Sequence, residues 1–266
     1  YNEVQRTQRM GANMELELKK ECLDTYEPGE PQTLTQEGTT ETIVPDYCPD
    51  IARIISAEGA VYLHGGAEQE GLSGTVRVTV LYTPENETGV RALEFALPFT
   101  AQGEGLSDCT HVAAETEIEL LESRMLNPRK IFTRCKLVTH LTGYRKVCLS
   151  LSSDVETLPE QRVEKRCCGQ AATLLRQIVE KDLTFSETMS LSLGREGAAE
   201  LLHCRTSGTV TETKVIGNKL IFKGVFLVSV LYRTTGGQLA SASSELPFSQ
   251  IMEIGSASES GQGSKH

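Results

Sequence analysis

The clearest pattern along the chain is an alternation of apolar and polar residues in two separate blocks. The first block, Gly74–Tyr82, recurs as Gly224–Tyr232, and each is followed, after a polar segment of similar length, by Leu-Pro-Phe. Alternation with period two is typical of a half-buried β-strand, and matched blocks at matched spacing indicate an internal repeat. The residues expected in the core of the repeat are Val76, Val78, Val80, Leu81, Tyr82, Val228, Val230, Leu231 and Tyr232.

Short polar pairs mark turns between the expected strands. Asn127-Pro128 stands between two apolar runs in the middle of the chain, and Gly217-Asn218 stands in the same way before the second block. Such pairs predict β-hairpins, so the middle region is expected to hold a partial third copy of the repeat. Pro98 and Pro247 lack a backbone donor and are therefore expected at a strand end or on an edge strand.

Two segments carry a helical pattern. In Pro49–Ile55 the three isoleucines would share one face of a helix, and Asp46 or Asp50 could cap its first turn. Ala171–Glu180 groups its apolar residues in a way that fits either a helix or a strand.

These elements predict an all-β, mainly antiparallel fold of tandem β-sandwich-like modules, formed from an internal repeat, with one or two short helices. The expected organisation is a mobile N-terminal arm (1–14), a first β-module (15–105), middle strands forming a partial repeat (106–170), a second β-module (171–254) and a flexible Gly/Ser-rich tail (255–266).

Composition and charge narrow the classes of function. Aromatic residues make up 5% of the chain and there is no Trp, which disfavours a deep aromatic ligand pocket. The formal net charge of −10 disfavours binding to nucleic acid or to anionic membranes, which need clustered Lys and Arg. No apolar stretch is long enough for a membrane span, and the first thirty residues lack a secretory leader pattern. If Tyr1 follows no leader, we expect synthesis and retention in a cytoplasm.

The chain has 8 cysteines but no C-x-x-C pair, which gives a zinc site little support. Cys167 and Cys168 are adjacent, within the charged segment Glu164–Gly169, and are expected in an exposed loop where a thiol can react. Two interpretations of the cysteines stay open: inert buried thiols, or late cross-linking between subunits, in which Cys167 and Cys168 would take part.

Catalytic and metal-binding patterns are missing from the sequence. There is no G-x-S-x-G elbow, no Walker loop and no H-E-x-x-H, and the five histidines are scattered. We therefore expect no enzyme, with no catalytic residue, cofactor or metal. Asp46 and Asp50 could bind a cation, although capping a helix is favoured. Arg129 and Lys130 could grip an anion, although solvated turn charges are favoured.

The segments Ile43–Ile55 and Leu126–Ile131, with the paired Val-Leu-Tyr and Leu-Pro-Phe blocks, resemble the SPOCS-domain family of clostridia and related spore formers, over about residues 15–254. Its best-known members are spore-envelope morphogenetic proteins, so the resemblance implies a noncatalytic assembly module that acts in the mother cell or on the forming spore surface. Those members also carry a LysM-type module that docks on the coat-basement ATPase, whereas this chain ends in a Gly/Ser tail. In the second copy, Gly194–Leu202 replaces the Pro-Asp stretch.

Together with the repeated β-modules, the abundant cysteine and the absent catalytic residues, the resemblance leads us to expect a structural subunit of a bacterial spore surface layer, whether coat, exosporium or a spore appendage, that self-assembles through its β-modules. The alternative is an adaptor that recruits other spore-coat proteins during sporulation. A carbohydrate-binding β-sandwich is disfavoured because aromatic platforms are few. The expected partners are other copies of the chain and other spore-envelope proteins, with no nucleic acid and no membrane insertion. The expected location is the mother-cell cytoplasm during synthesis and then the spore surface.

Overall fold

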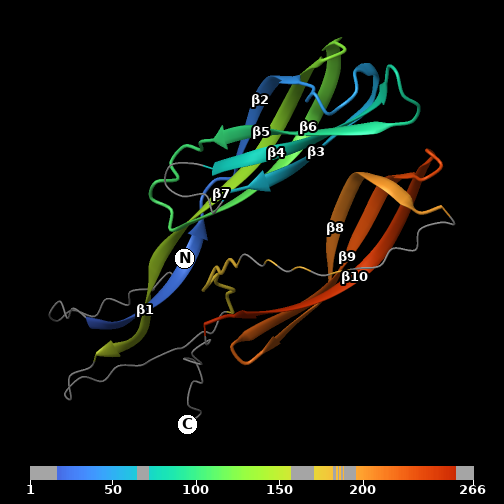
Figure 1. Cartoon of the computed structure of the whole chain (residues 1–266). Coiled ribbons are helices and arrows are strands. Elements are labelled where there is room, and N and C mark those ends of the chain that lie inside the picture. The colour runs from blue at the N-terminus through green and yellow to red at the C-terminus, as the bar shows by residue number, and fades with distance from the viewer. Residues whose placement is uncertain are drawn as a thin grey trace. The chain divides into compact units, whose positions relative to one another are not determined.

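A computed structural model of the chain describes residues 17–64, 72–156, 171–181, 184, 186, 188 and 196–255, and every regular element among them is a β-strand (Figure 1). The strands are β1 (Glu17–Pro28), β2 (Gln32–Ile43), β3 (Ile51–Leu63), β4 (Leu72–Pro84), β5 (Arg91–Ala101), β6 (His111–Asn127), β7 (Lys130–Glu156), β8 (Ala198–Ile216), β9 (Lys219–Thr234) and β10 (Leu239–Glu253). The expected all-β, mainly antiparallel fold is confirmed. The chain forms two compact units, 1–27 with 146–176 and 28–145 with 177–266.

Two antiparallel sheets pack together to form the main core of the larger unit. One sheet has the order β3-β4-β5, and in the other β7 pairs with both β2 and β6. Val76, Val78 and Val80 of β4 are fully buried in one cluster with Ile131 and Cys135 of β7. The period-two pattern thus places one face of β4 against the second sheet, as expected for a half-buried strand.

The third sheet, β8-β9-β10, repeats the plan of β3-β4-β5. Gly74 of β4 lies opposite Phe99 of β5, and Gly224 of β9 lies opposite Phe248 of β10. In both pairs the ring lies over the glycine, where a Cβ atom would meet ring carbons. The recurrence of Phe in the two Leu-Pro-Phe blocks therefore goes together with the recurrence of glycine on the central strand, because the ring occupies the place of a Cβ atom.

The two meanders also share irregularities of the backbone. In β3 the register shifts between Ile51 and Arg53 and between Ile54 and Ser56. In β8 the first two shifts lie at Ala198/Glu200 and Leu201/His203, which are the matching places. Bulges are local features of backbone pairing, so their agreement supports the repeat independently of side-chain similarity.

The bulges correct one expectation, because Pro49–Ile55 is not a helix. β3 begins at Ile51, and its inward side chains are Ile51, Ile54 and Ala57. Each bulge adds a residue to the strand, so the inward positions fall three apart and imitate a helical pattern. Ala171–Glu180, for which helix and strand were both open, has no regular secondary structure.

Both predicted hairpins are present. Pro128-Arg129 joins β6 to β7, and Gly217-Asn218, with Gly217 at φ 60°, joins β8 to β9. Pro98 lies in β5 and Pro247 in β10, each an edge strand of its sheet among the described residues, as expected. Of the residues assigned to the repeat core, Val76, Val78, Val80, Tyr82, Val230 and Tyr232 are buried, whereas Leu81, Val228 and Leu231 are partly exposed.

Several expectations fall outside the described residues, among them the arm 1–14 and both Cys167 and Cys168. Apart from Gly255, the expected tail also lies outside them. The module boundaries drawn from the sequence remain a prediction.

Candidate functional site

The two motifs that carry the family resemblance meet at the side chain of Arg129. One guanidinium nitrogen, Nη1, donates to the carbonyl of Cys48 at 2.8 Å and to Asp50 Oδ1 at 3.0 Å. The other, Nη2, donates to the carbonyl of Val44 at 2.9 Å and to Asp46 Oδ1 at 3.0 Å. A planar fork with several donors suits this arrangement, which we call the Arg129 clamp.

Backbone contacts join the same segments. The amide of Val44 donates to the carbonyl of Arg129, and the amide of Ile51 donates to the carbonyl of Pro128, both at 2.9 Å. Val44 and Ile51 are fully buried at either end of the loop that the clamp holds. The clamp therefore holds the loop over one end of the sandwich core, where Val44 and Ile51 are buried.

Tyr82 lies beneath this loop with no exposed surface. Its hydroxyl donates to the carbonyl of Pro49 at 3.4 Å. Burial, followed by the neighbouring Cys48, raises the pKa of Tyr82 to about 12. The residue thus stays neutral, as a buried phenol should.

These contacts revise the expected roles of the charged residues. Asp46 and Asp50 cap no helix, because β3 is a strand, and both accept from Arg129. Arg129 is ion-paired rather than solvated, and Lys130 pairs with Glu41. Sequence reasoning missed that Arg129 is the partner of Asp46 and Asp50; the one available signal was that both motifs belong to the same resemblance.

The clamp leaves one aromatic residue outside. Tyr47, between the two clamped aspartates, is 88% exposed, and nearby Ile43 at the end of β2 is 71% exposed. A loop fixed by four side-chain hydrogen bonds thus presents Tyr47 to the surface. Tyrosine is one of the residue types that most often anchor contacts between proteins.

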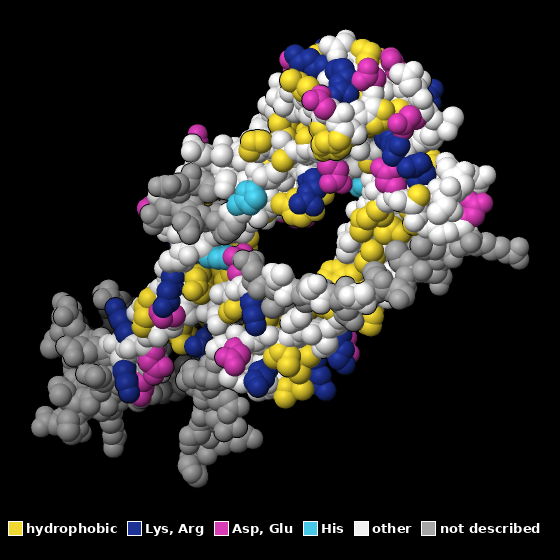
Figure 2. Space-filling model, viewed as in Figure 1, with side chains coloured by type: hydrophobic (Ala, Val, Ile, Leu, Met, Phe, Trp, Pro, Cys, Tyr) yellow, Lys and Arg dark blue, Asp and Glu magenta, His cyan; other side chains and the backbone are white. Residues whose placement is uncertain are grey.

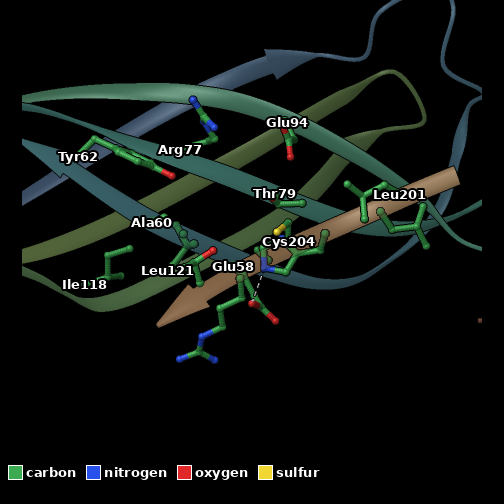
Figure 3. Close-up of a pocket in the computed structure, with 16 residues that line it drawn as sticks. Glu58, Ala60, Tyr62, Arg77, Thr79, Glu94, Ile118, Leu121, Leu201 and Cys204 are labelled. Carbon is green, nitrogen blue, oxygen red and sulfur yellow. Dashed lines mark ion pairs between the residues drawn. The ribbon is translucent and has the colours of Figure 1, made fainter. Parts of the chain in front are cut away.

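A groove of about 610 Å³ lies between residues of β3, β4, β5 and β6 on one side and of β8 on the other (Figure 3). Glu58 of β3 faces His203 of β8, with 3.2 Å between their side-chain atoms. The exposed thiol of Cys204, next to His203 in β8, also lines the groove. The labelled lining residues are Glu58, Ala60, Tyr62, Arg77, Thr79, Glu94, Ile118, Leu121, Leu201 and Cys204.

A charged cluster links the first meander to the second. Glu200 of β8 accepts from Arg91 of β5 at 2.7 Å and from Arg233 of β9 at 2.8 Å. The hydrogen bond from Arg91 to Glu87 raises the pKa of Arg91 further. On the face shown in Figure 2, charges of both signs are interspersed with apolar side chains.

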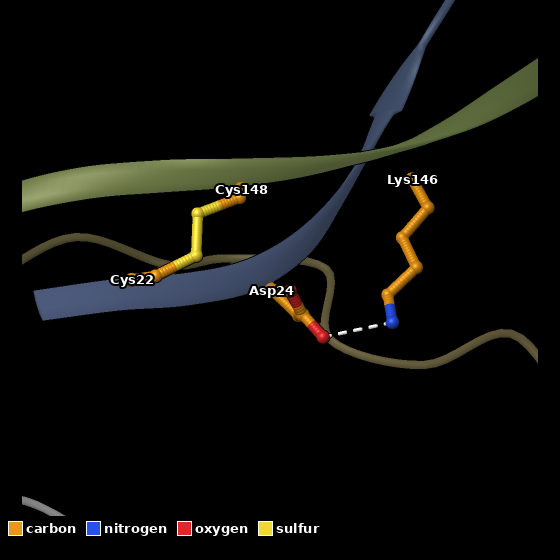
Figure 4. Close-up of a disulfide and its surroundings, with 4 residues drawn as sticks. All are labelled: Cys22, Asp24, Lys146 and Cys148. Carbon is orange, nitrogen blue, oxygen red and sulfur yellow. Dashed lines mark ion pairs between the residues drawn. A yellow bond between two sulfur atoms is a disulfide. The ribbon is translucent and has the colours of Figure 1, made fainter.

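The structure contains one cysteine pair that the sequence analysis did not single out. Cys22 of β1 and Cys148 of β7 form a disulfide, with 5.7 Å between their Cα atoms (Figure 4). Of the free cysteines in the described residues, Cys135 is buried, which raises the pKa of its thiol, and Cys204 is exposed. No sequence signal marks residues 126 positions apart as a pair; strand register brings them together.

Two classes of feature are not found among the described residues. No three His, Cys, Asp or Glu side chains gather as a metal site would require. No described helix is long and apolar enough to cross a membrane.

Fold and contacts together define an all-β protein with a duplicated antiparallel meander and a clamped loop. Residues 198–262 match the family model described as the SipL SPOCS domain, which covers β8, β9 and β10. The resemblance to the SPOCS-domain family is confirmed over these residues. Neither a curated protein nor a solved structure matches the chain. A SPOCS domain indicates a sporulation-related protein, and the family is not known for enzymatic activity.

Proposed function

We propose that the chain is a nonenzymatic structural subunit of a bacterial spore surface layer that assembles with other copies of itself. The observation that carries this proposal is the SPOCS match over β8–β10, on a chain that repeats the same meander. In this account the chain is made in the mother cell and deposited on the spore surface as coat, exosporium or appendage.

The outer face of the second meander supports self-assembly. Val225 and Leu227 of β9 stand where β4 has Thr75 and Arg77, and Leu227 is 45% exposed. Ile251 of β10, on the same face as Val225, is 50% exposed. Apolar residues have thus replaced polar ones on a solvent-facing sheet, a substitution typical of contact surfaces.

The first meander supplies the variant that tests this. Val225→Thr with Leu227→Arg gives β9 the residues that β4 already carries on its outer face, so the fold should be retained. We expect the purified chain to form large species in sedimentation velocity and electron microscopy, and the double variant to lose them. Leu227→Met, which keeps the face apolar, is the matched control.

The proposal would be contradicted by a monodisperse monomer at all concentrations and redox states. A second experiment, capture of partners from sporulating cells, distinguishes the adaptor alternative, in which the exposed Tyr47 would contact the partner. An adaptor should form a defined complex with another protein from sporulating cells, and Tyr47→Ala should abolish it while leaving the chain folded.

A further inference from the structure

The strand β1 is held by few contacts of its own. Among the described residues it pairs with one strand, β7, in the smaller unit. Side chains along this ribbon are largely exposed, including Leu18 of β1 and Leu149 and Leu151 of β7. A two-stranded ribbon without a packed face is marginally stable in water, so the pairing depends on additional ties.

Side-chain interactions between β1 and β7 occur at several positions along the ribbon. Cys22 is bonded to Cys148, Asp24 pairs with Lys146 at 2.8 Å, and Ser153 donates to the carbonyl of Lys19 at 3.3 Å. Their order reverses between the strands, as in antiparallel pairing. Near the end of β1, Thr25 Oγ1 and the amide of Tyr26 donate to the carbonyl of Leu175. The disulfide is the covalent tie in this set.

Reduction removes that tie. Two thiols then replace the sulfur–sulfur bond, and β1 can leave β7, whose residues from Lys146 onward would expose an unpaired edge. The connector Gly29-Glu30-Pro31 is the short link between β1 and β2, the kind of hinge across which a strand is exchanged.

We propose that β1 is an exchangeable strand: after reduction it pairs with β7 of a second copy, and on reoxidation Cys22 of one chain becomes bonded to Cys148 of the other. The second copy offers the same cysteine, lysine and serine, so every contact of the ribbon is reproduced between chains. This inference rests on the proposed self-assembly and identifies the strand and the bond that link the copies.

Formation of the interchain bond requires an oxidant, which we take to be a small-molecule disulfide such as oxidised glutathione. Each interchain bond formed takes two electrons and two protons from the two thiols and converts one oxidised glutathione into two glutathione molecules.

The test mixes two variants that cannot form the bond within one chain. Cys22→Ser keeps Cys148, and Cys148→Ser keeps Cys22; both also carry Cys167→Ser and Cys168→Ser. After reduction, mixing and oxidation by oxidised glutathione, we expect a heterodimer whose linking peptide joins Cys22 to Cys148 in mass spectrometry. The exposed Cys204, present in both variants, reports random oxidation, and we expect the Cys22–Cys148 link to exceed Cys204 links by about tenfold.

A second measurement uses the unaltered cysteines. The wild-type chain, reduced and then reoxidised, should form interchain Cys22–Cys148 links in a fraction that rises with protein concentration. Cross-links that favour Cys204, or a Cys22–Cys148 bond that stays within the chain at every concentration, would overturn the inference. If the wild-type chain still forms large species in that case, the proposed function stands and only the exchange fails.

Discussion

At the scale of single residues, the structure concentrates specific contacts at Arg129. Its guanidinium is shared by two carbonyls and two carboxylates of one loop, and it is about one-third exposed. Because the donor is ionised, all four hydrogen bonds are charge-assisted, and such bonds are stronger than those between neutral groups.

Arg129→Lys should loosen the loop, because a single ammonium cannot reach the carbonyls of Cys48 and Val44 together. We expect a loss of about 1–3 kcal/mol in the free energy of unfolding, measured with urea. Arg134→Lys is the matched control, since Arg134 pairs with Glu37 on an exposed surface and should lose far less. Equal losses would show that the clamp is not a special contact.

Tyr82 gives a prediction for alkaline pH. The pKa of Tyr82 is about 12, above the ordinary value of 10.0, because the side chain is buried. The unfolded chain therefore releases this proton first, so the stability is fully present below pH 10 and is lost as the pH rises through 12.

Tyr82→Phe should remove this part of the pH dependence. At about 1.4 kcal/mol per pKa unit, the free energy of unfolding of the wild type should fall by about 2 kcal/mol more than that of the variant between pH 9 and 12, measured by urea unfolding. Tyr47→Phe, at an exposed position, should keep the wild-type slope. If the free energy of unfolding changed with pH in the same way for wild type and Tyr82→Phe, a raised pKa of Tyr82 would be refuted.

At the scale of strands, the glycine and phenylalanine pairs set the register of both meanders. A Cβ at residue 74 would lie 2.5 Å from Phe99 Cζ and 2.8 Å from the carbonyl oxygen of Tyr62. The carbonyl belongs to the neighbouring strand and cannot move without disturbing the ladder. Close approach at this position therefore requires glycine.

Gly74→Ala should destabilise the sandwich by about 1–3 kcal/mol, as overpacking does, in urea unfolding. Gly224→Ala should act in the same way on the second meander, where the added atom would meet Phe248 and Thr209. Ser73→Ala, one residue along β4 and exposed, is the control. A variant within ~0.5 kcal/mol of wild type would contradict the close packing.

Strands of this kind were predictable only in part. Val76, Val78 and Val80 alternate without interruption, and the sequence therefore predicted β4 and its facing correctly. The spacing of Ile51 and Ile54 led to the wrong prediction of a helix, because two bulges set inward-facing residues of the strand three positions apart. Bulges have no reliable sequence signal. The Arg129 clamp and the Cys22–Cys148 bond also escaped prediction, because both depend on which strands pair across long stretches of chain.

At the scale of the whole molecule, one strand belongs to both compact units. Lys130–Arg145 of β7 lies in the larger unit, paired with β2 and β6, and the remainder pairs with β1 in the smaller unit. The larger unit has a buried core, whereas the described ribbon of the smaller unit has few buried side chains. The two units are therefore expected to open separately.

The Cys22→Ser/Cys148→Ser variant tests this. We expect trypsin to cut faster at Lys19 and Lys20 of β1, because the ribbon opens more often without its covalent tie. The main thermal transition, which reports the sandwich core, should shift by less than about 2 °C. A drop of many degrees would show that the ribbon and the core unfold as one.

The length of β7 has a mechanical consequence. Tension applied to the ribbon passes along a single continuous backbone into a strand whose two edges are hydrogen-bonded to β2 and β6. The load is then divided among many bonds that must break together, rather than one after another. A chain pulled through β1 and β7 should therefore yield at high force, as a tensile element would.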